Sequence, residues 1–169
     1  MKAKLIIENK EIEIEISEEE YKKLHPSEEK KTGYERVPEY DDYFHESGKG
    51  DVEFEIEDCY DIDNEYYESA NYYSSETVAE NNARADKLMR QLRRFSVEHR
   101  ECGVNFNDIK IKKYYLYYDY EDNELRTTFM FYFKHFGAIH FDSEGAAQAA
   151  IDEFRGELIW YFTEYKDSL

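Results

Sequence analysis

The chain has 169 residues, of which 41% are hydrophobic, and this is enough to build one substantial domain around an apolar core. Its 40 acidic and 22 basic residues give a formal net charge of −18, and 17 tyrosines and 11 phenylalanines supply much of the apolar mass. Such an aromatic content excludes a disordered chain, and the charge disfavours binding to nucleic acid or anionic membranes while favouring a basic protein partner.

Several chemistries lack their sequence signals. No apolar run approaches the roughly 18 residues of a membrane span, and the first ten residues turn polar too early for a signal peptide, so we expect a cytoplasmic protein. Cys59 and Cys102 form no zinc or disulfide pattern, and none of the five histidines lies in a ligand-spaced pair. Nucleotide-binding and hydrolase motifs are missing as well, so we predict a non-enzymatic protein without cofactor.

The N-terminal segment predicts a β-hairpin and a short helix. Residues 3–8 and 11–16 alternate apolar and charged side chains on either side of Asn9-Lys10, which is typical of two paired strands. Ser17 with Glu20 three residues later forms a capping-box pattern, and Pro26 ends the helix that this pattern starts. We therefore predict an acidic N-terminal region over residues 1–31, which ends in a linker.

The middle of the chain predicts an antiparallel meander followed by a long helix. Three strand-like runs occupy residues 33–37, 40–46 and 51–58, and Val52, Phe54 and Ile56 of the last run face one way. A polar stretch follows. The helix is expected from Ser75 to about His99, with a core face of Ala85, Leu88, Met89, Leu92 and Phe95.

The C-terminal third repeats this plan. After a break at residues 102–108, strands are predicted at residues 114–120, 125–133 and 137–141, with a turn at Asp122-Asn123. The final helix has a core stripe of Ala147, Ile151, Phe154, Leu158 and Phe162, and Gly156 is the place where it is expected to bend.

The starts of the two long helices resemble each other. NYYSSETVAENNA and IHFDSEGAAQAAI align so that Tyr73 matches Phe141, Ser75 matches Ser143, Glu76 matches Glu144 and Ala79 matches Ala147. An internal duplication and two ordinary capped helix starts both account for this pattern. The predicted fold is α+β: antiparallel β-meanders each followed by a helix, over residues 32–102 and 103–169, after the N-terminal hairpin and short helix.

Most of the acidity lies in the first 70 residues, which hold 23 acidic and 9 basic residues. On a strand, alternate carboxylates form a row spaced by about 6.6 to 6.8 Å, close to the advance of two nucleotides along one strand of a duplex. One hypothesis is therefore that these rows imitate a phosphate backbone, and the other is that they are the solvated faces of amphipathic strands. The predicted partner-binding residues are Glu11, Glu13, Glu15, Glu18, Glu19, Asp51, Glu53, Glu55, Glu57, Tyr66 and Tyr67.

The long helix has the opposite charge. Its basic residues Arg84, Lys87, Arg90 and Arg94 share one face, with Arg93 between them. A basic helix face can bind nucleic acid or a membrane surface. We expect these side chains instead to pair with carboxylates of the same chain or of a second subunit.

Two acidic stretches have the one-three-five spacing of a calcium loop. Asp61, Asp63 and Glu65 form the first, but Tyr66 replaces the glycine that the loop needs at its sixth position, and the twelfth position carries no acidic residue. The stretch that begins at Asp119 fails in the same way. We predict no metal site, and an incidental cation at residues 58–65 remains open.

Several stretches together resemble a family of small proteins from phages and integrated mobile elements of Gram-positive bacteria. These are TGYERV, ANYYSSETVAENNARADKLMRQLRRF, KKYYLYYDYEDNELRTTFMFYFKHFGAIHFDSEGAAQAAIDEF and ELIWYF, within residues 32–165. The resemblance implies a bacterial host cytoplasm. By analogy it also implies an inhibitor of a host nuclease or other defence effector, of the anti-CRISPR or anti-restriction type. The alternative is a structural, assembly or self-associating scaffold protein.

Overall fold

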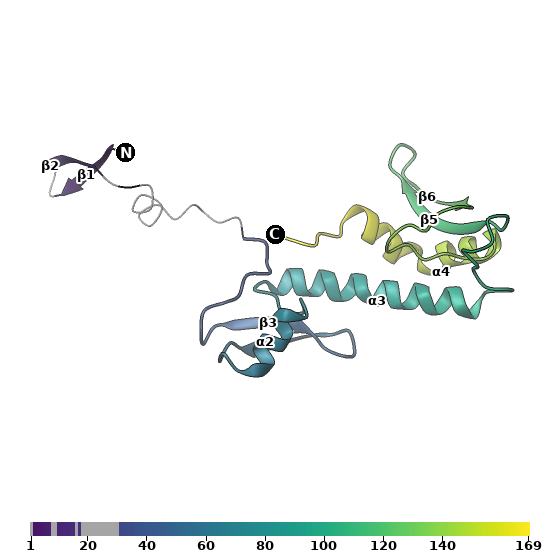
Figure 1. Cartoon of the computed structure of the whole chain (residues 1–169), viewed down its shortest axis with the longest axis horizontal. Coiled ribbons are helices and arrows are strands. Elements are labelled where there is room, and N and C mark those ends of the chain that lie inside the picture. The colour runs from purple at the N-terminus through teal and green to yellow at the C-terminus, as the bar shows by residue number, and fades with distance from the viewer. Residues whose placement is uncertain (1, 8–9, 16, 18–30) are drawn as a thin grey trace. The chain divides into compact units, whose positions relative to one another are not determined.

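A computed structural model describes residues 2–7, 10–15, 17 and 31–169, and it divides the chain into two compact units, Met1–Thr32 and Gly33–Leu169. The described residues form three two-stranded antiparallel sheets and three helices, as Figure 1 shows. This arrangement confirms the predicted α+β class.

The first unit contains the predicted N-terminal hairpin. Strands β1 (Lys2–Ile7) and β2 (Lys10–Glu15) pair in antiparallel register from Lys2 opposite Glu15 to Ile7 opposite Lys10. Strand β2 therefore begins one residue earlier than the alternation predicts. The predicted capped helix after Ser17 lies outside the described residues.

The second unit begins with a hairpin and two helices. Strands β3 (Asp42–Glu46) and β4 (Val52–Ile56) are followed by α2 (Asp61–Glu68) and the long helix α3 (Glu76–Glu98). The bounds of α3 agree with the prediction to within a residue. Phe44 and Val52 pack against a small core of Tyr73, Val78 and Ala79, so the hairpin rests on the first turns of α3.

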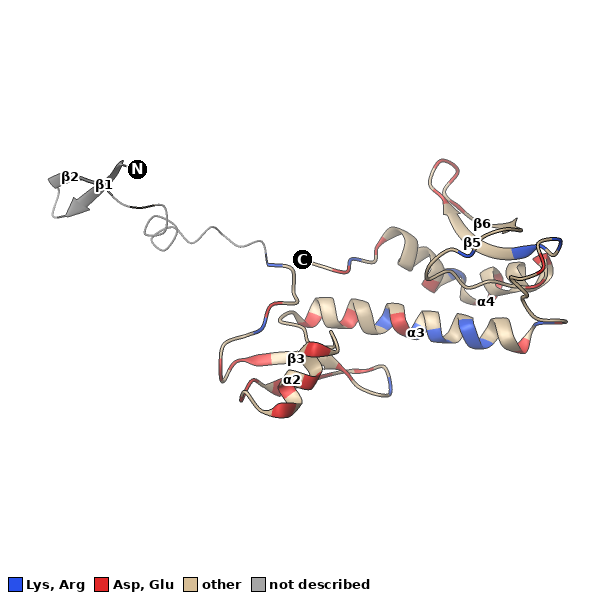
Figure 2. Ribbon diagram, in the orientation of Figure 1, with Lys and Arg blue, Asp and Glu red and all other residues tan. Residues whose placement is uncertain are grey.

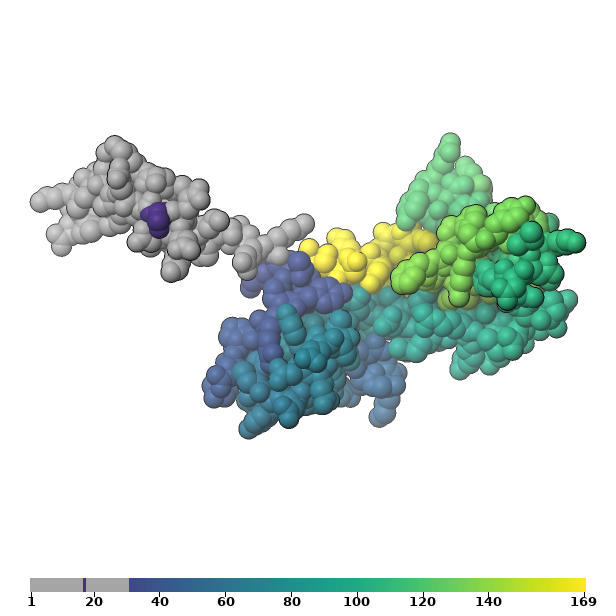
Figure 3. Space-filling model, viewed as in Figure 1, coloured from purple at the N-terminus to yellow at the C-terminus, as the bar shows by residue number. Residues whose placement is uncertain are grey.

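A second hairpin and helix complete the unit. Strands β5 (Lys113–Asp119) and β6 (Glu124–Met130) precede α4 (Glu144–Thr163), which packs against α3 and against both strands. The main core forms here, from Leu88, Leu92, Phe141, Ala146, Ala147, Ala150, Ile151 and Leu158. In the face drawn in Figure 3, the hairpin β3–β4 with α2 and the hairpin β5–β6 form separate masses beside α3.

The two halves of this unit share one arrangement. In each, the first strand of the hairpin forms a bridge with the residue two positions before the helix N-cap: Phe44 with Tyr73, and Tyr114 with Phe141. Each N-cap is a serine whose side chain accepts from a backbone N–H three residues on, Ser75 in α3 and Ser143 in α4. Because both the bridge and the cap recur at matched positions, the structure supports the internal duplication.

Two predicted strands are absent from the described part of the chain. Residues 33–37 are irregular, because Arg36 turns to Glu57, the N–H of Val37 donates to the Tyr72 hydroxyl, and Pro38 has no N–H. Residues 137–141 contribute only the bridge at Phe141. In place of each predicted three-stranded meander there is a hairpin, and its first strand is bridged by one residue just before the following helix, Tyr73 or Phe141.

Three further details differ from the prediction. The stretch expected to be a polar connection forms α2, because Asp63 accepts from the backbone N–H of Tyr60, the residue before its first turn. Helix α4 departs from helical geometry at Phe154, two residues before Gly156. Finally, Phe54 and Ile56 share the core-facing side of β4 with Val52, but they are 65% and 48% exposed.

Candidate functional site

The hairpin β3–β4 and helix α2 carry most of the negative charge of the second unit. Residues 33–70 hold 14 acidic and 2 basic residues, and we call this segment the acidic module. Figure 2 shows acidic positions along β3, α2 and their loops, whereas basic positions gather on the second half of α3. The module is thus the described surface best suited to a basic partner.

Strand β4 presents carboxylates on one side. Glu53 and Glu55 lie opposite His45 and Tyr43 in the β3–β4 register, and both glutamates are exposed, as is Asp51 just before the strand. None of these three carboxylates forms an ion pair with another described residue. They are therefore available to a cation outside the chain.

The opposite side of β4 is apolar and only partly covered. Val52 packs with Phe44 on the core beside α3, while Phe54 and Ile56 extend beyond this contact. Tyr40 and Tyr60, which flank the two strands, are 73% and 68% exposed. Exposed aromatic side chains are typical of protein interfaces.

The outer edge of β4 is unpaired within the described chain. Phe44 exchanges both of its backbone hydrogen bonds with Tyr73, so the neighbouring residues Tyr43 and His45 direct theirs to β4. By the same alternation, the N–H and C=O groups of Phe54 and Ile56 point away from β3. No described strand pairs with that edge, which is the geometry that accepts an added extended segment.

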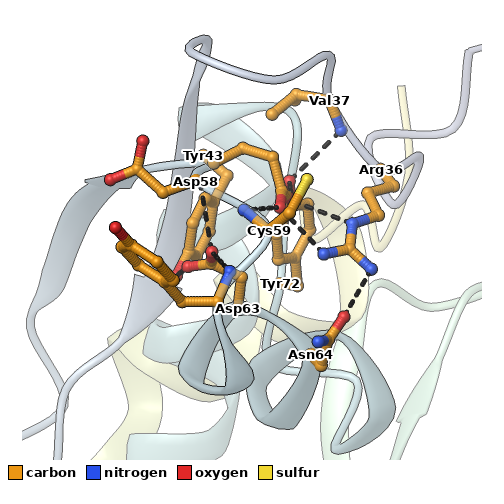
Figure 4. A network of polar contacts seen from close by, with 10 residues as sticks. Arg36, Val37, Tyr43, Asp58, Cys59, Asp63, Asn64 and Tyr72 are labelled. Carbon is orange, nitrogen blue, oxygen red and sulfur yellow. Dashed lines mark hydrogen bonds and ion pairs between the residues drawn. The ribbon is translucent and has the colours of Figure 1, made fainter.

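Glu57 does not belong to the exposed acidic row, contrary to the alternation along β4. It is 1% exposed and accepts from Arg36 Nη2 at 2.8 Å, from Arg36 Nε at 2.9 Å and from the Tyr72 hydroxyl at 2.8 Å. The N–H of Cys59 donates to it at 3.0 Å (Figure 4). These bonds, led by those from Arg36, lower the pKa of Glu57 to about 2. Glu57 is therefore a structural carboxylate.

A second buried carboxylate joins α2 to the hairpin. Asp63 accepts from the Tyr43 hydroxyl at 2.9 Å and from the backbone N–H of Tyr60 and Asp58, as Figure 4 also shows. Burial, with the Asp63 bond second, raises the pKa of Tyr43 well above its usual range. Because Asp63 is used in this way, residues 61–65 do not present the carboxylate set of a cation site. Among the described residues no cluster of histidine, cysteine or acidic side chains could hold a metal ion.

The two predicted tyrosines have different environments. Tyr66 is half-buried, and its ring stacks on His45 with centroids 4.1 Å apart, so it mainly holds α2 against β3. Tyr67 is 44% exposed, although its ring also meets Tyr72 edge-on and lies under the Arg36 guanidinium. Only Tyr67 presents a large surface to a partner.

The remaining predicted residues belong to the first unit. Glu11, Glu13 and Glu15 lie in β2, whose side chains are outside the described part, as are Glu18 and Glu19 altogether. Of the predicted residues, Asp51, Glu53 and Glu55 thus share β4 and its approach as exposed carboxylates, while the exposed Tyr67 lies on α2 of the same module. Sequence reasoning missed the exposed Tyr40 and Tyr60. Tyr40 follows the turn at Pro38, and Tyr60 immediately precedes α2. An aromatic residue at a chain reversal was the available signal in both cases.

The basic face of α3 is largely neutralised within the chain. Arg84 pairs with Glu157 at 2.8 Å, Arg90 with Glu46 at 2.7 Å and Arg94 with Glu98 at 3.9 Å. Arg84 also lies over the Trp160 ring at 3.9 Å and so connects α3 to α4. The prediction that these arginines pair with carboxylates of the same chain is confirmed.

Both cysteines are free and exposed. No described helix combines the length and the apolar character that crossing a membrane requires. Comparisons with protein-family models, with curated proteins and with solved structures found no match to this chain.

Proposed function

We propose that the protein binds a basic surface of a nucleic-acid-handling protein through the acidic module and thereby excludes nucleic acid from that surface. The observation that carries the proposal is the combination on β4 of unpaired, exposed carboxylates with exposed Phe54 and Ile56 along an unpaired edge. The carboxylates steer a cationic partner, and the apolar side chains supply contact area.

The resemblance to phage and mobile-element proteins points to a bacterial nuclease of a defence system as the partner. Inhibition by occupancy needs only tight binding, and it needs no catalytic group in the inhibitor. The row of Glu53 and Glu55 has the spacing by which a strand can imitate phosphates, so it competes with DNA for lysine and arginine side chains.

The test measures displacement of a labelled DNA duplex from candidate bacterial CRISPR and restriction nucleases by fluorescence anisotropy. We expect displacement at near-stoichiometric amounts of the wild-type protein. The double variant Glu53→Lys/Glu55→Lys should need about tenfold more protein, because it places cations opposite cations.

The matched control is Glu121→Lys/Glu153→Lys, which changes the net charge by the same amount at exposed positions outside the acidic module. This variant should displace DNA as the wild type does. If the two double variants lose the same activity, net charge alone acts and the β4 surface is not the binding site.

A second candidate function is self-association. The loop after β6 exposes Tyr132, Phe133 and Phe136, the last completely, and such a patch favours contact with another copy of the chain. Sedimentation velocity over a concentration series tests it, since Phe133→Ser/Phe136→Ser should then abolish a dimer that the wild type forms.

A further inference from the structure

A basic cavity lies at the far end of α3 from the hairpin β3–β4. Its volume is about 450 Å³, and its cationic wall consists of Arg93 in the last turns of α3, Arg100 just after that helix and Lys134 from the loop after β6. Phe106 and Ile139 contribute to an apolar wall, and His140 also lines the cavity. Two segments distant in sequence thus place three cations around one space.

These three cations are not neutralised within the described chain. Arg84, Arg90 and Arg94 of the same helix each pair with a carboxylate, whereas Arg93, Arg100 and Lys134 form no ion pair with a described residue. All three side chains are exposed, so in a protein of net charge −18 they form a local positive patch that can attract an anion.

The carboxylate of Asp142, two residues after His140, does not neutralise these cations. Its Oδ2 accepts from the backbone N–H groups of Glu101, Cys102 and Gly103 at 2.7 to 3.0 Å, and it forms no ion pair with the cavity cations. Capping of the α3 C-terminus does not explain the cluster either, because Arg93 lies more than a turn before Glu98 and the dipole acts within the last turn.

The other wall suits a flat apolar group. Phe106 meets the His140 ring edge-on at 5.0 Å, and Lys134 Nζ lies 5.4 Å from the Phe106 ring centroid. His140 is 7% exposed, and its Nε2 has no hydrogen-bond partner within the described chain. Aromatic rings next to a guanidinium pair provide both stacking and bidentate phosphate contacts.

We propose that this cavity binds a nucleoside monophosphate, with its phosphate on Arg93, Arg100 and Lys134 and its base against Phe106 and Ile139. The volume falls within the range of about 300 to 1,000 Å³ that small-molecule sites occupy. The site is separate from the acidic module, so it stands whether or not the proposed function holds.

The test is isothermal titration calorimetry of the full chain with the four common ribonucleoside monophosphates, with inorganic phosphate and with the free nucleosides. At least one monophosphate should bind more tightly than both of its parts. Arg93→Gln and Lys134→Gln should each weaken that binding by about tenfold or more, because each removes a charge-assisted contact.

The matched control is Arg94→Gln, which removes the adjacent arginine without altering the lining, and it should change the affinity less than twofold. Failure of all four monophosphates to bind at millimolar concentration would overturn the proposal. Equal binding of inorganic phosphate, or equal losses for Arg93→Gln and Arg94→Gln, would do the same.

Discussion

Glu57 combines burial with four accepted hydrogen bonds, two of them from Arg36. Its pKa of about 2 lies below the ordinary 4.5, so the folded state binds a proton there less readily than the unfolded chain does. The stability that this carboxylate contributes is therefore complete above about pH 4.5 and is lost as the pH falls toward 2.

The variant Glu57→Gln should lower the free energy of unfolding by about 3 kcal/mol at pH 7, because it leaves Arg36 and Tyr72 without their anionic acceptor. Urea denaturation followed by circular dichroism measures this loss. The difference from the wild type should shrink between pH 4.5 and 2. Glu53→Gln, an exposed neutralisation on the same strand, should change stability by no more than about 0.5 kcal/mol. Equal losses in the two variants would contradict the structural role of Glu57.

Gly33 is required by its conformation and by its neighbour. Its φ of +95° is unfavourable for other residues, and an added Cβ would lie 2.7 Å from Cγ2 of the buried Val78. Gly33→Ala should therefore cost about 2 kcal/mol or more of unfolding free energy. Gly48→Ala, where an added Cβ meets nothing within 4 Å, is the control and should leave the urea midpoint nearly unchanged. A fully stable Gly33→Ala protein would show that the chain before β3 is free to rearrange.

Helices α3 and α4 both begin at a serine N-cap, but the hydrogen bonds that the two serines accept differ in length. The N–H of Ala146 donates to Ser143 Oγ at 3.2 Å, while the N–H of Val78 lies 3.5 Å from Ser75 Oγ. Ser143→Ala should cost about 1 kcal/mol, and Ser75→Ala should cost measurably less, because its bond is at the limit of hydrogen-bond length. Thermal unfolding of the two variants makes the comparison, and a larger loss for Ser75→Ala would contradict it.

Elements with local signals could be predicted from the sequence. Helix α3 combines the serine cap at Ser75 with apolar residues at steps of three and four, and its predicted bounds hold to within a residue. Helix α2 was missed because its N-cap is Tyr60, which is no usual capping residue, and because Asp63 supplies the cap from inside the helix. The sequence shows a carboxylate there but not which N–H group it faces.

The candidate site depended on contacts between distant residues, and these were not predictable. Alternation along β4 correctly exposes Glu53 and Glu55, but it also predicts an exposed Glu57, whose partner Arg36 precedes it by 21 residues. Phe54 is exposed because the core beside α3 takes in Phe44 and Val52 of the hairpin but not Phe54. Convergence of Arg93 with Lys134 likewise depends on how the loop after β6 reaches α3.

At the scale of the whole molecule, charge is divided unevenly. The acidic module has an excess of twelve negative charges, with 14 acidic against 2 basic residues. Two arginines of α3 tie other elements to the helix: Arg90 pairs with Glu46 of that module, and Arg84 pairs with Glu157 of α4. Among the described residues, ion pairs therefore neutralise few of the carboxylates of the module, Glu46 and Glu57 among them. Self-repulsion among the remaining ones opposes the compact state.

Added salt should consequently stabilise the protein. Screening lengths fall to about 10 Å at 0.1 M salt, which weakens repulsion among exposed carboxylates more than it weakens short ion pairs. We expect the melting temperature to rise by a few degrees between about 10 and 200 mM sodium chloride at pH 7. Such a rise corresponds to a gain of about 1 kcal/mol in the free energy of unfolding. Glu53→Gln/Glu55→Gln should melt higher than the wild type at low salt and gain less from added salt, because two of the repelling charges are gone. A melting temperature that falls with salt would mean that the pairs of Arg36, Arg84 and Arg90 outweigh the repulsion.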